Sequence, residues 1–340
     1  MAESAALPPV LPLTFPWHAP LIEQIEAAWL KDRLPHALLL HGQAGLGKRR
    51  LAEWMARGLL CENSRDHLAA CGHCNGCRLV AAGSHPDLTR VTPEEGKQQL
   101  SVDQVRGVSE WLAMTSHQQG WKIALIDPAQ LMTIAAANSL LKTLEEPPAR
   151  SLLILVASSL QGLPATLRSR CQRLGIPRPP AAMALKWLSD TRSQSVAPQV
   201  LEFTGGAPLR ALEVHDAFVS LDEEMRSSLT DLLAGRADVT RVAQFWAKEA
   251  LADRLAWLDL WLMSLAREAV AGSGDLVTFP EQPVPLPSST NVLNISHLYR
   301  LVDRIRELKS QLLRTALNRD LAAEMLLAEL LTVFTRRQPQ

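Results

Sequence analysis

The sequence of 340 residues has no excess of charge of either sign. Its 35 lysines and arginines balance 35 aspartates and glutamates, so the formal net charge is zero. A protein that holds the phosphate backbone of nucleic acid over a broad surface needs a basic face. The charge balance therefore argues against that class of protein and leaves only a local basic patch open.

Long hydrophobic runs are also missing. The longest apolar run, 151–160, is far shorter than the roughly 20 residues that a membrane-spanning helix needs. Residues 1–15 contain Glu3 and no basic residue, unlike the basic start of a secretory signal peptide. We therefore expect a cytoplasmic protein with no membrane partner. In that compartment cysteines are mostly free thiols or metal ligands.

The composition and the hydrophobic pattern indicate an α/β fold followed by helices. A chain of this length exceeds one hydrophobic core, so two or three domains are expected. Four apolar segments are predicted strands: 37–41, 87–91, 122–126 and 151–157. Three helical patterns lie between them: 48–60, a capped helix beginning at Ser101, and 133–146. This alternation predicts a parallel sheet with helices on both faces.

The second half of the chain is predicted to be helical. Prolines at 177–180 indicate a linker, and a short helical segment over 181–212 is interrupted at 205–206. Helices follow from about residue 220, apart from a loop rich in glycine, proline and serine at 273–294. Core or interface positions are predicted for three tryptophans and an apolar stripe: Trp246, Trp257, Trp261, Leu298, Leu301, Ile305, Leu308 and Leu312.

A glycine-rich segment, 42–49, follows the first predicted strand and opens a helix, which is the position of a phosphate-binding loop. Gly42, Gly45 and Gly47 let backbone N–H groups face a phosphate, and Lys48 would reach the outer phosphates. The next position of such a loop carries a hydroxyl that holds magnesium. Here it is Arg49, which cannot coordinate a cation.

The acidic half of the same site is also incomplete. Asp127 follows the predicted strand 122–126, but the next residue is Pro128 instead of a carboxylate that could orient the attacking water. Two parts needed for hydrolysis are therefore absent. We expect a degenerate nucleotide site that does not hydrolyse ATP, with nucleotide binding through Lys48 left open.

Four of the five cysteines lie within one short segment, in the pattern C-x9-C-x2-C-x2-C: Cys61, Cys71, Cys74 and Cys77. This spacing lets four thiolates surround one tetrahedral ion, and such sites are typically structural zinc. Free thiols, a redox pair and an iron–sulfur cluster are the weaker alternatives. Because four thiolates fill the shell, the nearby histidines are expected to be solvent-exposed loop residues: His67, His73 and His85.

Two further segments carry a family resemblance. Residues 135–148 (AAANSLLKTLEEPP) and 163–171, which ends in Ser-Arg-Cys, resemble signatures of the AAA+ subunits of bacterial clamp loaders. The four-cysteine insertion lies where such subunits carry zinc, and the segments at 85–87 and 205–212 also fit. The resemblance covers about residues 15–215.

The resemblance implies a three-part fold and a specific class of subunit. An AAA+ α/β domain at 1–177 would carry a zinc module at 61–77. A small helical lid at 178–219 and an all-α collar at 220–340 would follow. Within the family, delta-prime subunits keep the fold and the Ser-Arg-Cys motif but lose ATP hydrolysis. Arg49 and Pro128 indicate that type.

Two residues receive roles from the resemblance. Arg170, in the Ser-Arg-Cys motif, would act in trans as an arginine finger on ATP held by a neighbouring subunit; its alternative is a surface ion pair. Arg210 resembles a nucleotide-sensing arginine, and a structural role is equally open. From residue chemistry alone, Cys171, next to Arg170, is expected to be a packed core thiol rather than a metal ligand or a nucleophile.

The implied function is support of ATP-driven loading of a sliding clamp onto primed DNA during replication. The implied partners are gamma/tau-type ATPase subunits and delta in a hetero-oligomer, with the clamp and primer-template DNA reached through the assembly. The chain would have no ATPase of its own but would be part of a DNA polymerase III holoenzyme, a nucleotidyltransferase. The alternatives are an active ATPase subunit of the same complex and a stand-alone zinc-module protein that binds nucleic acid.

Overall fold

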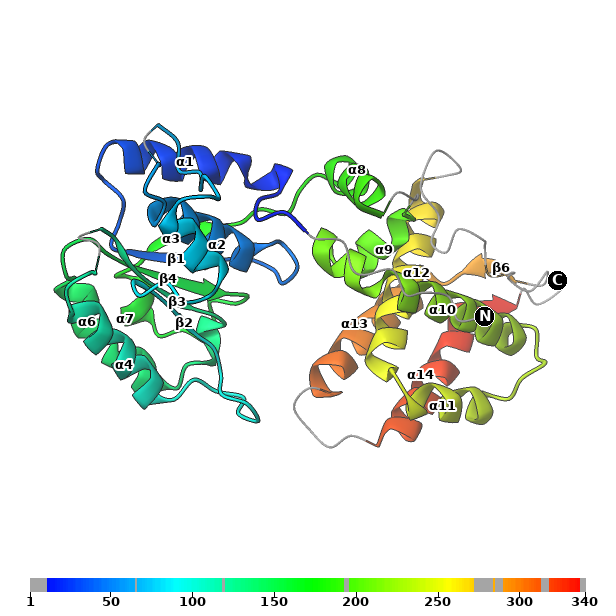
Figure 1. Ribbon diagram of the computed structural model, residues 1–340. Coiled ribbons are helices and arrows are strands. Elements are labelled where there is room, and N and C mark those ends of the chain that lie inside the picture. Colours follow the sequence, from blue (N-terminus) through cyan, green and yellow to red (C-terminus); the bar gives the residue numbers. More distant parts are fainter. Residues whose placement is uncertain are drawn as a thin grey trace, which may run out of the picture. The chain divides into compact units, whose positions relative to one another are not determined.

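The computed structural model describes residues 11–64, 66–117, 120–192, 196–271, 284, 290–312 and 318–336 (Figure 1). The chain divides into two compact units. The first unit contains Met1–Gln194 and Ala207–Arg210, and the second contains Ser195–Gly206 and Ala211–Gln340. The finer division into three domains stays a prediction.

A five-stranded parallel sheet forms the centre of the first unit, in the order β2-β3-β4-β1-β5. Its strands are β1 (Ala37–His41), β2 (Leu88–Val91), β3 (Lys122–Ile126), β4 (Ser151–Ala157) and β5 (Gln172–Gly175). The sequence predicted β1, β3 and β4 with the observed bounds and placed the start of β2 one residue early. It missed β5, an edge strand whose side chains are mostly exposed.

Helices cover both faces of this sheet, as predicted (Figure 1). Alternate residues of β1 show this, since Leu38 and Leu40 belong to the same buried cluster as Leu51 of α2 (Lys48–Leu59), whereas Leu39 belongs to the cluster that contains Val105 of α4 (Val102–Ala113). The helices of this unit are η1 (Pro16–His18), α1 (Ala19–Leu30), α2 (Lys48–Leu59), α3 (Asn75–Ala81), α4 (Val102–Ala113), η2 (Ala129–Leu131), α5 (Ile134–Ser139), α6 (Leu141–Glu145), α7 (Ala165–Arg168) and α8 (Ala181–Arg192).

Local chemistry explains where two of these helices begin and end. The predicted capping box of α4 is present: the Gln104 N–H donates to Ser101 Oγ at 3.3 Å, and the Ser101 N–H donates to Gln104 Oε1 at 3.0 Å. The prediction of a single helix over 133–146 was wrong, because the structure has two helices, α5 and α6, separated at Leu140. The Ser139 hydroxyl donates to the Ala136 carbonyl oxygen at 2.7 Å, which competes with regular helical hydrogen bonding there.

The second unit is mainly helical. Its elements are α9 (Pro198–Phe203), α10 (Pro208–Leu233, whose first residues belong to the first unit), α11 (Val239–Lys248), α12 (Leu251–Ala271), β6 (Thr290–Leu293), α13 (Ile295–Leu312), α14 (Arg319–Val333) and β7 (Phe334–Arg336). The expected fold class, an α/β unit with a parallel sheet followed by helices, is confirmed. In the described part of the chain, no helix is both long and apolar enough to span a membrane.

The core of the second unit confirms most of the predicted positions. Trp246, Trp257 and Trp261 are fully buried. Of the predicted stripe, the four members from Leu298 to Leu308 are buried on α13, and Leu312 is half-buried. Most of the predicted loop 273–294 lies outside the described residues, but its last residues form β6. The loop prediction was wrong there, because antiparallel pairing with β7 from the end of the chain supplies hydrogen bonds that no local pattern reveals.

Candidate nucleotide and metal sites

The phosphate-binding loop connects β1 to α2 and has the backbone conformation that its glycines allow. Gly42, Gly45 and Gly47 have φ angles of 143°, 81° and 82°, a region that favours glycine. A Cβ on Gly47 would lie 2.5 Å from Cε2 of Phe15, so the aromatic ring lies directly against the loop. The loop is therefore formed, and another part of the chain covers it.

Lys48 points into its own loop. The side chain is 6% exposed, and its Nζ donates to the Gln43 carbonyl oxygen at 2.7 Å. Burial lowers the pKa of Lys48, an effect that the nearby Asp127 carboxylate opposes. The ammonium that would reach a phosphate is thus bound to the backbone of the loop.

Arg49 forms an ion pair with Asp127, with 3.7 Å between Nε and Oδ2. Burial raises the pKa of Asp127, and the positive charges of Arg49 and Lys48 act in the opposite direction. Beside this pair, Arg90 holds Glu53 through two hydrogen bonds of 2.7 and 2.8 Å. The cavity that these four side chains help to line measures about 10 Å³, which is space for one water molecule.

Aromatic side chains secure the loop from the N-terminal side, and sequence reasoning missed them. Trp17 Nε1 donates to the Leu46 carbonyl oxygen at 3.0 Å, and His18 Nε2 lies 2.8 Å from the same oxygen. Phe15 stacks on Trp17 with ring centroids 4.9 Å apart, and Trp187 of α8 meets both rings edge-on. The sequence signal that could have indicated this contact is the presence of three rings within the segment Phe15–His18.

The segment that carries Arg210 lies against the loop through its backbone. The Leu209 N–H donates to the Gly45 carbonyl oxygen at 3.1 Å. A Cβ on Gly45 would lie 2.8 Å from Cβ of Arg210, so only glycine fits there. The structure therefore brings the predicted glycines, Lys48, Asp127 and the backbone of Arg210 into one region of the first unit.

Arg170 lies just after α7 and has two acceptors. Its Nη2 is 2.5 Å from Oε1 of Glu145, the last residue of α6, and its Nη1 donates to the Thr166 carbonyl oxygen at 3.0 Å. The side chain of Arg170 is 35% exposed. The neighbouring Cys171 is a packed core thiol, as predicted, and burial raises its pKa to about 11.

The four predicted metal-ligating cysteines form one cluster. Their sulfur atoms all lie within 4.8 Å of one another, around the start of α3. Backbone N–H groups of Cys71, Cys74 and Cys77 donate to the sulfurs of Cys61, Cys71 and Cys74 at 3.3, 3.4 and 3.3 Å. Hydrogen bonds from the backbone at His73 and Cys74 lower the pKa of Cys71 to about 5. Donors of this kind favour thiolates, so the cluster is suited to a metal ion such as zinc.

The nearby histidines follow the prediction in two of three cases. His67 and His73 are exposed, but His85 is only 4% exposed, so the prediction for it was wrong. Its Nδ1 accepts the Asp87 N–H at 3.1 Å, which fixes the turn into β2. Burial lowers the pKa of His85 and favours the neutral ring. A lone histidine in a polar segment gives no periodic signal for such a role.

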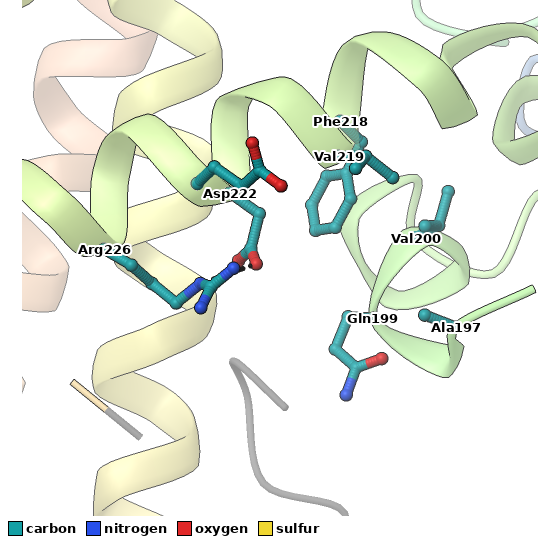
Figure 2. A pocket seen from close by; sticks show the side chains of 8 residues that line it. Ala197, Gln199, Val200, Phe218, Val219, Asp222 and Arg226 are labelled. Carbon is teal, nitrogen blue, oxygen red and sulfur yellow. Dashed lines mark hydrogen bonds and ion pairs between the residues drawn. The ribbon is translucent and has the colours of Figure 1, made fainter. Parts of the chain in front are cut away.

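A separate cavity of about 170 Å³ lies between α9 and α10 of the second unit (Figure 2). Its apolar side includes Val200, Phe218 and Val219, and its polar side includes Asp222 and Arg226. The Asp222–Arg226 pair is 2.9 Å apart, so these two charges neutralise each other. None of the sequence-predicted site residues lines this cavity.

Comparisons with known proteins give one consistent family. The profile described as DNA polymerase III, delta subunit, matches residues 17–180, and the profile for the C terminus of that subunit matches 221–332. The Escherichia coli K12 DNA polymerase III subunit delta' is 36% identical over 314 residues, which is 90% of this chain and 92% of the relative. The corresponding Pseudomonas aeruginosa PAO1 subunit is 35% identical, over 74% of this chain and 77% of the relative.

A solved structure of a DNA polymerase III gamma subunit-related protein from Thermotoga maritima aligns with 92% of this chain and 99% of its own. Its TM-score is 0.41 at 14% identity, so it adds nothing to the assignment. The family profiles and the sequence relatives establish the family. The chain belongs to the family of bacterial DNA polymerase III delta-prime subunits, as the resemblance in its sequence predicted.

Proposed function

We propose that this chain is a non-hydrolysing subunit of a clamp loader that places a sliding clamp onto primed DNA in the cytoplasm. Its partners would be the gamma/tau-type ATPase subunits and delta, with the clamp and primer-template DNA reached through the assembly. The division at 1–177, 178–219 and 220–340 belongs to this proposal, with the last part serving as the collar.

The ion pair between Arg49 and Asp127 carries the proposal. A hydrolysing site needs a hydroxyl at the position of Arg49 and a magnesium ion held near the carboxylate at the position of Asp127. A guanidinium 3.7 Å from the carboxylate instead puts a fixed positive charge where magnesium would be needed. Pro128 supplies no base for the attacking water.

Two contacts of the loop give additional support. Lys48 is bound to the Gln43 carbonyl oxygen, and the rings of Phe15 and Trp17 pack over the loop. A nucleotide would have to break the first contact and displace the second. We therefore expect weak nucleotide binding at most and no hydrolysis by this chain.

The expected result for the isolated chain is no ATP hydrolysis above the background of the assay. Arg49→Thr should not restore it, because Pro128 still leaves the site without a base. The measurement is steady-state phosphate release by the purified protein, by Arg49→Thr and by Lys48→Ala. Turnover by the natural chain that disappears in Lys48→Ala would contradict the proposal and identify an active ATPase subunit.

Arg170 is the residue through which this chain would take part in hydrolysis elsewhere in the complex. A guanidinium offers a planar fork of donors that suits phosphate oxygens, and its charge is permanent. An arginine supplied in trans stabilises the charge of a phosphoryl-transfer transition state. Arg170 follows α7 and its side chain is partly exposed, which is compatible with contact to a neighbouring subunit.

Zinc is the metal we propose for the four-cysteine cluster. Four thiolates in tetrahedral arrangement suit both zinc and iron–sulfur chemistry, but nothing in the proposed function needs electron transfer. A bound zinc ion would fix the segment between α2 and β2 by linking Cys61 to the three cysteines around the start of α3. Its role would be structural.

A further inference from the structure

The Arg170 side chain is folded back onto its own unit. Its two terminal nitrogens are both engaged, Nη1 with the Thr166 carbonyl oxygen four residues earlier and Nη2 with the Glu145 carboxylate. Two partners on two helices fix the direction of a guanidinium far better than one. To reach a phosphate on another subunit, Arg170 would have to release at least the Glu145 contact.

Glu145 is placed to make this contact. It ends α6, and within the described part of the chain its carboxylate pairs with Arg170 alone. Its side chain is 52% exposed, so solvent and salt reach the pair. An exposed ion pair of this kind shifts an equilibrium by only about twofold to fivefold. The contact is therefore weak enough for a stronger anion to replace it.

We propose that Glu145 holds Arg170 in a resting conformation and competes with the phosphate for its guanidinium. This inference rests on the proposed function of Arg170 as an arginine finger. A terminal phosphate offers three oxygens and more negative charge than a carboxylate, so it displaces Glu145 once the neighbouring site is assembled. Until clamp and DNA bind and complete the neighbouring site, Glu145 keeps the finger away and limits premature hydrolysis. Glu145 is thus a positioning residue that acts through Arg170.

The test uses a complete reconstituted clamp loader that contains this chain. Glu145→Gln keeps the size and the hydrogen-bonding ability of the side chain but removes the charge that holds the guanidinium. Glu146→Gln is the matched control, because it removes the same charge one residue later from an exposed side chain with no ion pair to a described residue. Arg170→Ala and the double variant Glu145→Gln/Arg170→Ala complete the set, with assembly checked by gel filtration.

The inference predicts faster ATP hydrolysis by the Glu145→Gln loader, by about twofold to fivefold, when clamp and DNA are absent. With saturating clamp and DNA the rates should converge, because phosphate has already displaced the carboxylate. The difference should also shrink as salt rises, since salt screens an exposed pair. The double variant should behave like Arg170→Ala, and Glu146→Gln like the natural chain. A purely structural role of Glu145 would not produce this dependence on salt and on clamp.

Two results would overturn the inference in distinguishable ways. If Arg170→Ala lowers hydrolysis while Glu145→Gln matches Glu146→Gln or slows the unstimulated rate, Glu145 does not restrain the finger, and the proposed function stands. If Arg170→Ala leaves hydrolysis unchanged in an intact loader, the arginine-finger proposal fails, and the restraint by Glu145 fails with it.

Discussion

At the scale of single residues, stability depends on buried polar side chains that either leave one atom without a hydrogen-bond partner among the described residues or hold several acceptors at once. His18 and Arg254 are the clearest cases, one in each unit. His18 is fully buried, and no described residue forms a hydrogen bond with its Nδ1. Arg254 is 5% exposed and gathers several acceptors around one guanidinium.

His18 predicts a dependence of stability on pH. Burial lowers its pKa below the usual 6.5, so the unfolded chain binds the proton more readily than the folded chain. The contribution of neutral His18 to the free energy of unfolding is complete above about pH 6.5. It is lost as the pH falls toward the lowered pKa, by up to about 1.4 kcal/mol per pH unit. Urea unfolding of the natural chain and of His18→Gln between pH 7.5 and about 5 measures this. His41 and His85 shift in the same direction, so only the difference between the two proteins reports on His18.

The variant should lose less stability on acidification than the natural chain, because glutamine can still donate to the Leu46 carbonyl oxygen but does not titrate. Equal losses in both proteins would mean that His18 is protonated as easily in the folded state as in the unfolded state.

Arg254 predicts a large loss of stability on truncation. Its Nη1 donates to the carbonyl oxygens of Phe245, Trp246 and Glu249 at the end of α11, and its Nη2 pairs with Glu224 at 2.9 Å. A cation at the C-terminal end of a helix also interacts well with the helix dipole. Arg254→Ala leaves the three carbonyl oxygens without this donor, whereas water can solvate the half-exposed Glu224, so the free energy of unfolding should fall by about 3 kcal/mol.

The control for this prediction is Lys248→Ala, on the exposed side of the same helix end. Chemical denaturation of both variants gives the comparison. A loss below about 0.5 kcal/mol for Arg254→Ala, as for an ordinary surface substitution, would show that water satisfies those carbonyl groups equally well.

At the scale of elements, the sequence predicts what continuous apolar patterns specify. β1, β3 and β4 are buried central strands, and their runs of leucine, isoleucine and valine define their bounds. β5 was missed because exposed Gln172 and Arg173 interrupt any such run. The pairing of β6 with β7 was missed for a different reason, since strand partners distant in the chain leave no trace in local sequence.

The candidate sites follow the same logic. Spacing identified the glycines and the four cysteines because each set is local in sequence. The aromatic cover of the loop was not predicted, since Trp187 reaches Phe15 and Trp17 only through the tertiary fold. The ion pair of Arg49 with Asp127 was not predicted either. It depends on the parallel arrangement of the strands, which brings the ends of β1 and β3 to one edge of the sheet.

The four-cysteine segment predicts one zinc ion per chain. Cys74→Ser should release the metal, because serine is a poor zinc ligand and Cys74 also caps α3. The parallel sheet should persist, since the cluster packs separately from both sheet cores. Metal analysis of reduced protein and far-ultraviolet circular dichroism check both parts. Cys171→Ser is the control and should keep its zinc, because Cys171 packs against the sheet away from the cluster. Full zinc content in Cys74→Ser, or no metal in the natural chain, would refute the assignment.

At the scale of the whole molecule, the fold could be predicted because local signals agreed with one another. Strand and helix patterns, the glycine loop and the two signature segments all pointed to one α/β architecture, and sequence relatives over 90% of the chain confirm the family. The division of the helical part into lid and collar rests on the resemblance alone. Helical periodicity shows which faces are buried but not which helices belong together.

In the proposed function, this chain has no ATP chemistry of its own and contributes Arg170 to the ATP site of a neighbouring subunit. The most direct test is ATP hydrolysis by a reconstituted loader, with clamp and DNA present, that carries either the natural chain or Arg170→Ala. Arg178→Ala, the loss of another exposed arginine in the same unit, is the control. The account predicts that Arg170→Ala assembles normally but lowers hydrolysis, with incomplete rescue by Arg170→Lys, because an ammonium keeps the charge but loses the fork. Equal rates for the natural, Arg170→Ala and Arg178→Ala loaders, with assembly intact, would contradict it.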